Sequence, residues 1–227
     1  MPPESTDPLQ IFNEIDVREG FDARFGTRTG AVFHGDLSRP WHVPVFPTIF
    51  GEAMAKLPLR HEEFVFLDIG SGMGRAVMLA SDFPFKRCIG LEIDPTYHEE
   101  ALRNLSIYRS ESQRCRELSS ACADVMTYAF PKDDLVVWFN NSFGPGPAGA
   151  KLTAAFLEHL RQAMKVSPRR VAFVYIEPDH ADLVAALGLF HPFGHPDELG
   201  KSRILESATL PGRPPARHFP FAIYANF

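Results

Sequence analysis

The sequence predicts an α/β protein built on a largely parallel sheet with helices on both faces. From residue 64 onward, short apolar runs of strand length alternate with stretches whose apolar residues recur at helical spacing. Several of these runs end in Asp, Glu or Asn, and the first is followed directly by glycines. Such alternation requires right-handed crossovers, which bring the carboxyl ends of the strands to one edge, where ligands bind.

The first strands and helices have clear sequence signals. Residues 64–69 (FVFLDI) form a continuous apolar run, typical of a strand buried on both faces. A helix over 75–81 and a strand over 87–93 are expected next. Asp94 and Pro95 then begin a helix, because an N-cap acceptor followed by proline is a helix-start signal. The apolar face of that helix comprises Tyr97, Ala101, Leu105 and Tyr108.

The second half of the chain continues the alternation. A weaker strand is expected over 118–122, and LVVWFN (135–140) and RVAFVYIE (170–177) are predicted as two buried strands. Near the C-terminus, residues 203–210 and 219–227 are expected to form a closing antiparallel pair around a Gly-Arg-Pro-Pro turn. The amphipathic helix between the two buried strands has an apolar face formed by Leu152, Phe156, Leu160 and Ala163.

Length and composition narrow the class of protein. The 227 residues fit a single domain, with 45% hydrophobic and 22% charged residues. The 20 prolines argue against a long-helix bundle, and the 20 phenylalanines supply most of the aromatic residues. No apolar run approaches the ~20 residues that cross a bilayer, and the N-terminus lacks the features of a signal peptide. We therefore expect a cytoplasmic protein without a membrane partner.

Charge and cysteine content exclude further classes. The formal net charge of −5 lacks the basic footprint of a nucleic-acid-binding protein, so a nucleic-acid partner is not expected. Arg24, Arg28 and Arg39 lie close in sequence and leave room for a local basic patch. The three cysteines are an odd number without metal-like spacing, which argues against a disulfide framework.

The N-terminal part of the chain differs from the rest. Residues 1–10 are polar and contain proline, and we expect a disordered tail. Residues 11–60 are too interrupted by proline and glycine to form a separate domain and are expected to be an appendage of the main domain, 61–227. One short helix in the appendage is expected to carry Ile15, Phe21 and Phe25.

The strongest functional signal is the glycine loop DIGSGMGR, residues 68–75, between a strand and a helix. Its glycines allow sharp turns and close approach to a ligand, and the helix N-terminus adds unpaired N–H groups. A P-loop is excluded because the G-K-[ST] ending is absent. The dinucleotide fingerprint needs a small residue where Arg75 stands, which disfavours an NAD-dependent oxidoreductase.

Acidic residues follow the next two strands. Glu92 closes the second strand, where a carboxylate can accept both hydroxyls of a ribose, a feature shared by several nucleoside-binding folds. Asp124 follows the third strand and either accepts the amino group of an adenine or caps a turn. The pattern D-x-G-x-G-x-G matches the S-adenosylmethionine loop of class I methyltransferases, while Glu92 supports a nucleoside ligand without distinguishing this cofactor from NAD.

Residues 64–105 resemble bacterial class I methyltransferases whose motif reads D-x-G-S-G-K-G-R, followed by P-F-R/K-R and G-V/I-E. They are similar, more distantly, to the Dot1-like lysine methyltransferases, which share D-L-G-S-G. The similarity extends over most of residues 20–165, and Met73 stands where the closer group has Lys. The resemblance implies a seven-stranded Rossmann-like sheet with a C-terminal antiparallel hairpin, and S-adenosylmethionine as cofactor, with S-adenosylhomocysteine as product.

The resemblance also implies a lid. The segments FDARFGT (21–27) and FPTIF (46–50) would lie beside the methionine end of the cofactor, and a hydrophobic strap on the edge of the sheet is the alternative. The residues expected to bind the cofactor are Asp68, Gly70, Ser71, Gly72, Gly74, Arg75, Glu92, Ile93, Asp124, Val125, Thr27 and Thr48.

The segment NNSFGP (140–145) is the candidate transfer site, where class I enzymes carry N-P-P-Y/F. In-line methyl transfer depends on alignment, and the carbonyl of Asn140 or Asn141 can accept an N–H from the acceptor. Phe143 can face the methyl group with its ring and stabilise positive charge. The alternative is a turn rich in Asn, Gly and Pro, and the missing proline after Asn140 weakens the link to N-P-P-Y.

The sequence therefore predicts an S-adenosylmethionine-dependent methyltransferase acting on a nitrogen acceptor, either a small molecule or a protein lysine. O-methylation of a small metabolite, or a module that binds the cofactor without turnover, are the alternatives. No metal is expected, because the histidines near the C-terminus match no structural zinc spacing. These residues are His180, His191 and His195, with Glu177 and Asp179 nearby.

Overall fold

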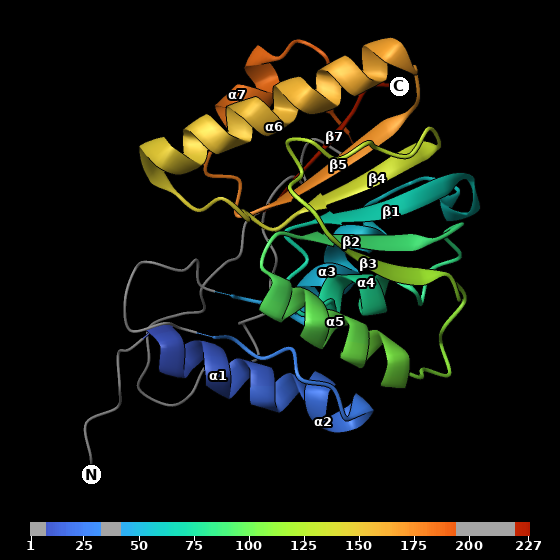
Figure 1. Cartoon of the computed structure of the whole chain (residues 1–227), viewed down its shortest axis with the longest axis vertical. Helices are drawn as coiled ribbons and strands as arrows, with labels where there is room; N and C mark the ends of the chain where they lie inside the picture. Colours follow the sequence, from blue (N-terminus) through green and yellow to red (C-terminus); the bar gives the residue numbers. More distant parts are fainter. Residues whose placement is uncertain (1–7, 33–41, 194–220) are drawn as a thin grey trace.

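The computed structural model describes residues 8–32, 42–193 and 221–227, which include a seven-stranded sheet in the order β3-β2-β1-β4-β5-β7-β6 (Figure 1). Strands β1 to β5 pair in parallel, and β7 runs antiparallel to both β5 and β6. This arrangement confirms the predicted fold class. The strands are β1 (Phe64–Ile69), β2 (Cys88–Glu92), β3 (Leu118–Cys122), β4 (Asp134–Phe139), β5 (Val171–Ile176), β6 (His191–Pro192) and β7 (Phe221–Ala225).

Helices cover both faces of the sheet. Figure 1 shows α6 and α7 on one side, which we call the α6 face, and α1 to α5 on the other, which we call the N-terminal face. A short 3₁₀ turn, η1 (His61–Glu63), precedes β1. The helices are α1 (Pro8–Glu19), α2 (Phe21–Phe25), α3 (Pro47–Ala55), α4 (Arg75–Ala80), α5 (Pro95–Ile107), α6 (Gly146–Val166) and α7 (Ala181–Ala186).

Alternate residues of the central strands pack into two different cores. Side chains in a strand point to opposite faces in turn, so the almost completely buried strands β1, β4 and β5 supply both cores. The core of the N-terminal face includes Phe50, Phe66 and Trp138, and that of the α6 face includes Phe139 and Phe156. Burial on both faces explains why these strands are continuous apolar runs in the sequence.

The parallel strands end along one edge, which gathers the loops of interest. Asp68 of β1 is in register with Gly90 of β2 and with Trp138 of β4, so the loops that follow these strands are neighbours. Among the described residues, Asn141 and Glu177 are the non-glycine positions with positive φ, at 45° and 50°. Both follow strands at this edge, and such conformations concentrate at functional sites.

The N- and C-terminal segments differ in detail from the predictions. Helix α1 begins at Pro8, so residues 8–10 are helical, contrary to the expected tail. The single short helix expected around Phe21 is two helices, because Gly20 adopts a left-handed φ of 65° between α1 and α2. The predicted strand 203–210 lies outside the described residues, and β7 pairs with β5 on one side and with β6 on the other.

Candidate active site

The glycine loop between β1 and α4 is built from left-handed glycines. Gly70, Gly72 and Gly74 have φ values of 71°, 52° and 86°, which L side chains adopt only with strain. A Cβ on Gly70 would overlap Ser142, and one on Gly72 would overlap the imidazole of His42. The loop is therefore enclosed by the segment after β4 on one side and by the N-terminal segment on the other.

Glu92 lies against the backbone of this loop. Its side chain is 7% exposed, and its Oε2 accepts from the N–H of Gly72 at 2.7 Å. Its Oε1 accepts from the N–H of Asp94 at 2.8 Å, at the start of α5. A carboxylate has about four lone-pair sites, so these two bonds fix its orientation and leave capacity for two hydroxyl donors.

Asp68 and Ser71 are buried polar residues of the loop. Burial, together with the nearby charge of Glu92, raises the pKa of Asp68 well above its ordinary value. The hydroxyl of Ser71 is buried and has no hydrogen-bond partner among the described residues. A Cβ on Gly90 would lie 2.5 Å from this hydroxyl, so a glycine in β2 allows the loop to rest on the sheet. Sequence analysis missed Gly90 because an isolated glycine in a strand gives no indication of what approaches it.

The guanidinium of Arg75 binds the N-terminal segment. It is 2% exposed, its Nε donates to Thr29 Oγ1 at 2.6 Å, and both terminal nitrogens donate to Asp16. Asp22 lies 3.5 Å from the same group, and the ring of Phe21 lies below it, 5.3 Å away. The side chain of Arg75 thus fixes α1 and α2 to the first turn of α4, and the contact of this residue with the cofactor stays a prediction.

The two threonines predicted at the cofactor have different surroundings. Thr27 is buried, and its hydroxyl donates to Asp22 at 2.7 Å, as does that of Thr29. Burial acts to raise the pKa of Asp22, but the threonine hydrogen bonds outweigh it and the pKa is lowered. Thr48 is exposed, and its N–H donates to Glu19 at 3.0 Å, where α3 begins. The structure does not bring these two threonines together.

Asn104 of α5 forms a second connection between the loop and the N-terminal segment. It is fully buried, accepts from the N–H of Arg28 at 2.9 Å and donates to the carbonyls of Arg28 and Met73 at 2.8 and 3.0 Å. Sequence analysis did not identify it. The available signal was a polar residue at helical spacing between the buried positions Ala101 and Tyr108.

His42 covers the loop at Gly72. Its buried ring lies 5.2 Å from the ring of Tyr97, and its Nε2–H donates to the carbonyl of Thr29 at 3.2 Å. Burial lowers the pKa of His42 to about 4, so the imidazole is neutral at physiological pH. No motif pointed to this residue in the sequence.

The residues after β2 and β3 lie at the rim of the site. Ile93, next to Glu92, is 62% exposed. Val125 is buried in the core of the α6 face. Asp124 is exposed, and its Oδ1 accepts from the N–H of Met126 at 2.9 Å. Of the two interpretations of Asp124, the structure shows the turn cap, and the adenine contact stays a prediction.

The loop after β4 is anchored by its asparagines. Nδ2 of Asn140 donates to the carbonyl of Val43 at 3.2 Å. Nδ2 of Asn141 donates to Asp179 at 2.7 Å, and the hydroxyl of Tyr175 donates to its Oδ1 at 3.4 Å. The two predicted transfer residues are therefore held by the N-terminal segment and by the loop after β5.

Ser142 and Phe143 complete this loop. The hydroxyl of Ser142 donates to the carbonyl of Ile69, which fixes the loop to the end of β1. The ring of Phe143 lies 5.1 Å from that of Phe139 and 6.1 Å from that of Phe156. The ring thus packs against the core of the α6 face, and a position beside the transferred methyl group stays a prediction.

The histidines near the C-terminus lie in different surroundings. His180 is buried, and its Nε2–H donates to the carbonyl of Gly144 at 3.2 Å, whereas His191 is exposed in β6. His195 lies outside the described residues. Within the described ranges, no three His, Cys, Asp or Glu side chains gather as metal ligands, and no helix is long and apolar enough to span a bilayer.

Solved structures with the same arrangement of strands and helices are numerous, although no protein-family model and no curated protein matches this sequence. A proposed RNA methyltransferase from Pyrococcus horikoshii is 16% identical, with a TM-score of 0.57 over 94% of this chain and 96% of that one. Magnesium protoporphyrin IX methyltransferase from Synechocystis PCC 6803, solved with S-adenosylmethionine bound, is 13% identical, with a TM-score of 0.53 over 99% of this chain and 86% of that one. The protein therefore has the Rossmann-like fold of class I methyltransferases.

Proposed function

We propose that this protein is an S-adenosylmethionine-dependent methyltransferase that acts on a nitrogen acceptor. The observation that carries the proposal is the left-handed glycine loop with the carboxylate of Glu92 hydrogen-bonded to its backbone, at the carboxyl edge of the sheet. Both solved structures described above are methyltransferases by name, and one of them holds this cofactor. The agreement of loop, carboxylate and fold supports the same cofactor here.

The residues at this edge fit the cofactor in three respects. The left-handed conformations of Gly70 and Gly72 give the loop the sharp turns of a ligand-binding loop, and Ser142 and His42 pack against these two glycines. Glu92 retains acceptor capacity for two ribose hydroxyls, and the exposed Ile93 provides an apolar surface for the base. When bound, the cofactor supplies the methyl group in electrophilic form.

The chain's own contribution to the reaction is alignment. Because Nδ2 of Asn140 donates to Val43, the side chain is oriented, and no described residue donates to its Oδ1. That oxygen can accept an N–H of the acceptor and direct the nitrogen lone pair. Asn141, held by Asp179 and Tyr175, keeps the loop in its left-handed conformation.

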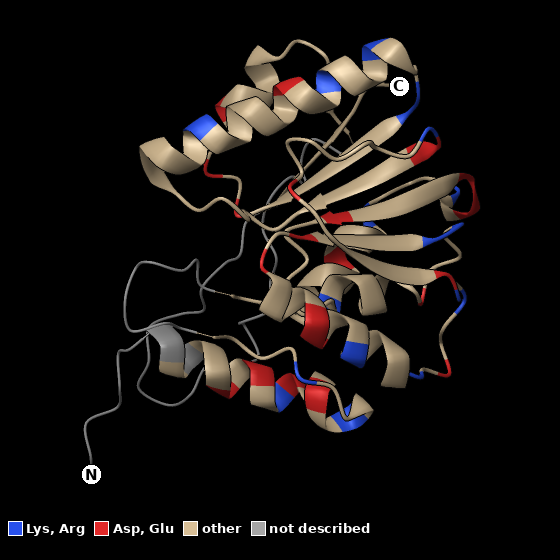
Figure 2. Cartoon of the chain, viewed as in Figure 1, with Lys and Arg blue, Asp and Glu red and all other residues tan. Residues whose placement is uncertain are grey.

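The charge of the edge favours an amine as acceptor. Figure 2 shows red segments where the parallel strands end, while blue and red alternate around their amino ends. Glu92, Asp94, Asp124 and Asp179 lie along this carboxyl edge, and Arg75, the basic residue of the glycine loop, is paired. Such a field attracts an ammonium group and repels a phosphate chain. A small amine or a protein lysine fits this edge better than a nucleic acid.

The N-terminal segment, residues 8–32 and 42–55, would serve as the lid of this site. Arg75 and Asn104 fix it to the glycine loop, and Val43 contacts the transfer loop. The lid and the main domain, 61–227, would then act as one unit in cofactor binding. Bound cofactor should accordingly protect the lid from proteolysis.

Calorimetric titration with S-adenosylhomocysteine tests the cofactor site. We expect binding by the native protein and a loss of affinity of about tenfold or more in Glu92→Gln, since a paired acceptor is removed. Gly72→Val should abolish binding, and Glu99→Gln, on the exposed face of α5, is the matched control. The proposal would be wrong if the native protein did not bind S-adenosylhomocysteine. It would also be wrong if both Glu92→Gln and Gly72→Val bound it as tightly as the native protein does.

Turnover separates an enzyme from a module that only binds the cofactor. With a panel of amines and hydroxyl compounds, we expect S-adenosylhomocysteine to form with an amine. Asn140→Ala should lower kcat while the affinity for S-adenosylhomocysteine is unchanged. Product formation only with hydroxyl acceptors would overturn the nitrogen assignment, and none with any acceptor would favour the binding module.

A further inference from the structure

The loops after β4 and β5 meet at the carboxyl edge of the sheet, beside the candidate active site. Nδ2 of Asn141 donates to Oδ2 of Asp179 at 2.7 Å, and this hydrogen bond joins the predicted transfer loop to the segment between β5 and α7. In the proposed function, Asp179 only holds Asn141 in place. The surroundings of its carboxylate give it a second role.

Both loops adopt backbone conformations that are costly for L residues. Asn141 has a φ of 45°, and Glu177, two residues before Asp179, has a φ of 50°; these are the described non-glycine residues with positive φ. The main-chain N–H of Asp179 donates to the carbonyl of Glu177 at 2.7 Å, which closes this turn. Strained conformations concentrate at functional sites, and here they bring two polar side chains into contact.

The amide group of Asn141 has a defined orientation. Burial raises the pKa of Tyr175 to about 12, so its hydroxyl is protonated at physiological pH and donates to Oδ1 of Asn141 at 3.4 Å. The same hydroxyl accepts from the main-chain N–H of His180 at 3.3 Å. Nδ2 of Asn141 therefore faces Asp179, whose carboxylate is the acceptor in this contact.

Asp179 keeps one carboxylate oxygen for a ligand. Its side chain is exposed, and no described residue donates to its Oδ1 or forms an ion pair with it. Figure 2 shows red segments in the loop between β5 and α7 that carries this residue. The adjacent His180 is buried, and its Nε2–H donates to the carbonyl of Gly144 at 3.2 Å, so this loop is anchored to the transfer loop. A carboxylate held in this way loses little side-chain freedom when it binds a cation.

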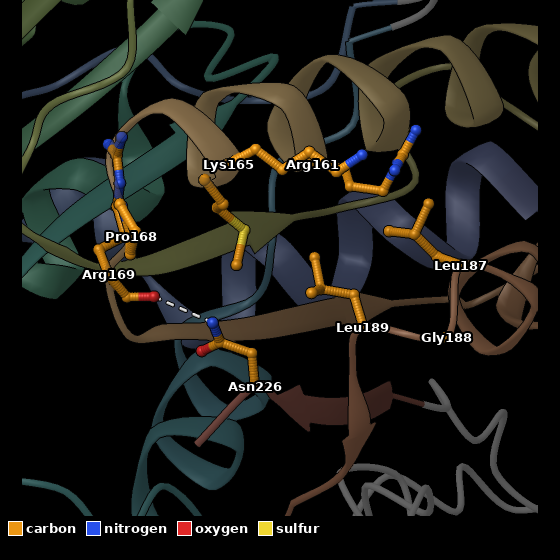
Figure 3. Close-up of a pocket in the computed structure, with 9 residues that line it drawn as sticks. Arg161, Lys165, Pro168, Arg169, Leu187, Gly188, Leu189 and Asn226 are labelled. Carbon is orange, nitrogen blue, oxygen red and sulfur yellow. Dashed lines mark hydrogen bonds between the residues drawn. The ribbon is translucent and has the colours of Figure 1, made fainter.

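The opposite end of the sheet offers a contrast. A hollow of about 350 Å³ there is lined by the cationic residues Arg161, Lys165 and Arg169, among others (Figure 3). The guanidinium of Arg161 pairs with Glu158, and that of Arg169 donates to two main-chain carbonyls. These guanidinium groups are held by partners within the protein, whereas Oδ1 of Asp179 has none among the described residues.

Resting on the proposed function, we propose that Asp179 binds the ammonium group of the methyl acceptor through Oδ1 and so selects cationic amines over neutral nitrogen compounds. Oδ2 stays bonded to Asn141 in the complex. The bound ammonium then releases one proton to water. Its nitrogen lone pair forms the new bond to carbon, while the electrons of the broken carbon–sulfur bond stay on sulfur. A neutral amide nitrogen gains less from the carboxylate, because it carries no charge.

An exposed aspartate that only anchors Asn141 would bind no ligand. Titrations of the full chain saturated with S-adenosylhomocysteine, monitored by amide chemical shifts, distinguish the two roles. The cationic probe is n-butylamine, and 1-butanol is its neutral analogue. We expect n-butylamine to shift the amides of Asn141, Asp179 and His180 and to bind about fivefold more tightly than 1-butanol. Equal affinities, or shifts confined to other parts of the chain, would contradict the proposal.

Asp179→Asn removes the charge and keeps an oxygen that accepts from Nδ2 of Asn141. Its affinity for n-butylamine should fall about fivefold, while its affinity for S-adenosylhomocysteine is unchanged. Asp182→Asn, in the first turn of α7, removes the same charge three residues later and is the matched control. If Asp179→Asn bound n-butylamine as the native protein does and only Asp179→Ala bound it more weakly, Asp179 would be an anchor alone.

Turnover adds a separate measurement. With an amine that the native protein methylates, Asp179→Asn should raise KM about fivefold and change kcat less, because the hydrogen bond to Asn141 is retained. Loss of an anchor would instead lower kcat. Failure of the native protein to bind S-adenosylhomocysteine would overturn the proposed function. Normal binding of S-adenosylhomocysteine, together with equal n-butylamine affinity in native protein and Asp179→Asn, would overturn the assignment of Asp179 alone.

Discussion

The two faces of the sheet are closed in different ways. On the α6 face, aromatic rings pack on one another, with the ring of Phe156 lying 5.5 Å from that of Phe139 and 6.2 Å from that of Phe173. On the N-terminal face, the aromatic core is supplemented by buried hydrogen bonds and ion pairs, chiefly those of Arg75 and Asn104. These polar interactions connect the N-terminal segment to the glycine loop, whereas the aromatic side chains of α6 pack on the sheet.

This difference should separate the determinants of stability from those of binding the proposed cofactor. Hydrophobic packing is non-directional and tolerates adjustment, but a buried ion pair fixes orientation and is costly to break. Changes on the N-terminal face should therefore alter both stability and cofactor affinity, and changes under α6 should alter stability alone. The predictions below test that separation.

The largest effect is expected for Arg75→Met. The variant leaves the carboxylate of Asp16 in a mostly buried position without its partner, which should cost about 4 kcal/mol of unfolding free energy. Affinity for S-adenosylhomocysteine should fall as well, since the N-terminal segment is released from the glycine loop. Urea denaturation and calorimetry measure the two quantities. Arg103→Met, at an exposed pair with Glu100, is the control and should change neither.

On the other face, Leu160→Ala should cost about 3 kcal/mol through lost packing and the cavity left behind. Its affinity for S-adenosylhomocysteine, measured where the variant remains folded, should equal that of the native protein. A large loss of affinity would contradict the proposed separation of the two faces.

Acid should weaken the N-terminal face through His42. Its pKa in the folded protein, about 4, lies below the ordinary value of 6.5, so its contribution to stability is complete above pH 6.5 and is lost as the pH falls toward 4. Between pH 7 and pH 5 the cost is about 2 kcal/mol. Urea denaturation at the two pH values should show this loss in the native protein and in the control His98→Gln. The loss should be smaller in His42→Asn, and an identical loss there would exclude His42 as its source.

The smallest effect is expected for Asn104→Ala. It leaves the backbone of Arg28 and Met73 without three hydrogen bonds, at a cost of about 1–2 kcal/mol after water and local adjustment replace part of them. Hydrogen exchange should show faster opening of residues 26–32 in this variant. Unchanged exchange there, with a loss of stability elsewhere, would show that the hydrogen bonds of Asn104 do not hold the N-terminal segment in place.

The sequence predicted those features that local patterns encode. Strand β1 and the start of α5 were evident because a continuous apolar run and the Asp94-Pro95 signal act within a few residues, and Asp94 does accept from the N–H of Thr96 at 2.8 Å. The glycine loop was evident for the same reason. Its surroundings were not, since His42 approaches Gly72 from a distant part of the chain.

Residue roles that depend on distant partners escaped prediction. The position of Arg75 in the motif suggested a cofactor contact, but its partner Asp16 lies 59 residues earlier, and no spacing rule links them. The break at Gly20 depends on a left-handed glycine that a helical pattern alone does not reveal. Asp124 could cap a turn or face a base, and only the local geometry distinguished these roles.

The ion pair between Asp16 and Arg75 also sets an order of events during synthesis. Helix α1 leaves the ribosome 59 residues before its partner, an interval of about 3–12 seconds at ordinary translation rates. During that interval the apolar side chains of Phe12 and Ile15 have no sheet to cover. Helix α1 therefore cannot take its final position until the chain through α4 has been made, and until then its apolar side chains are exposed.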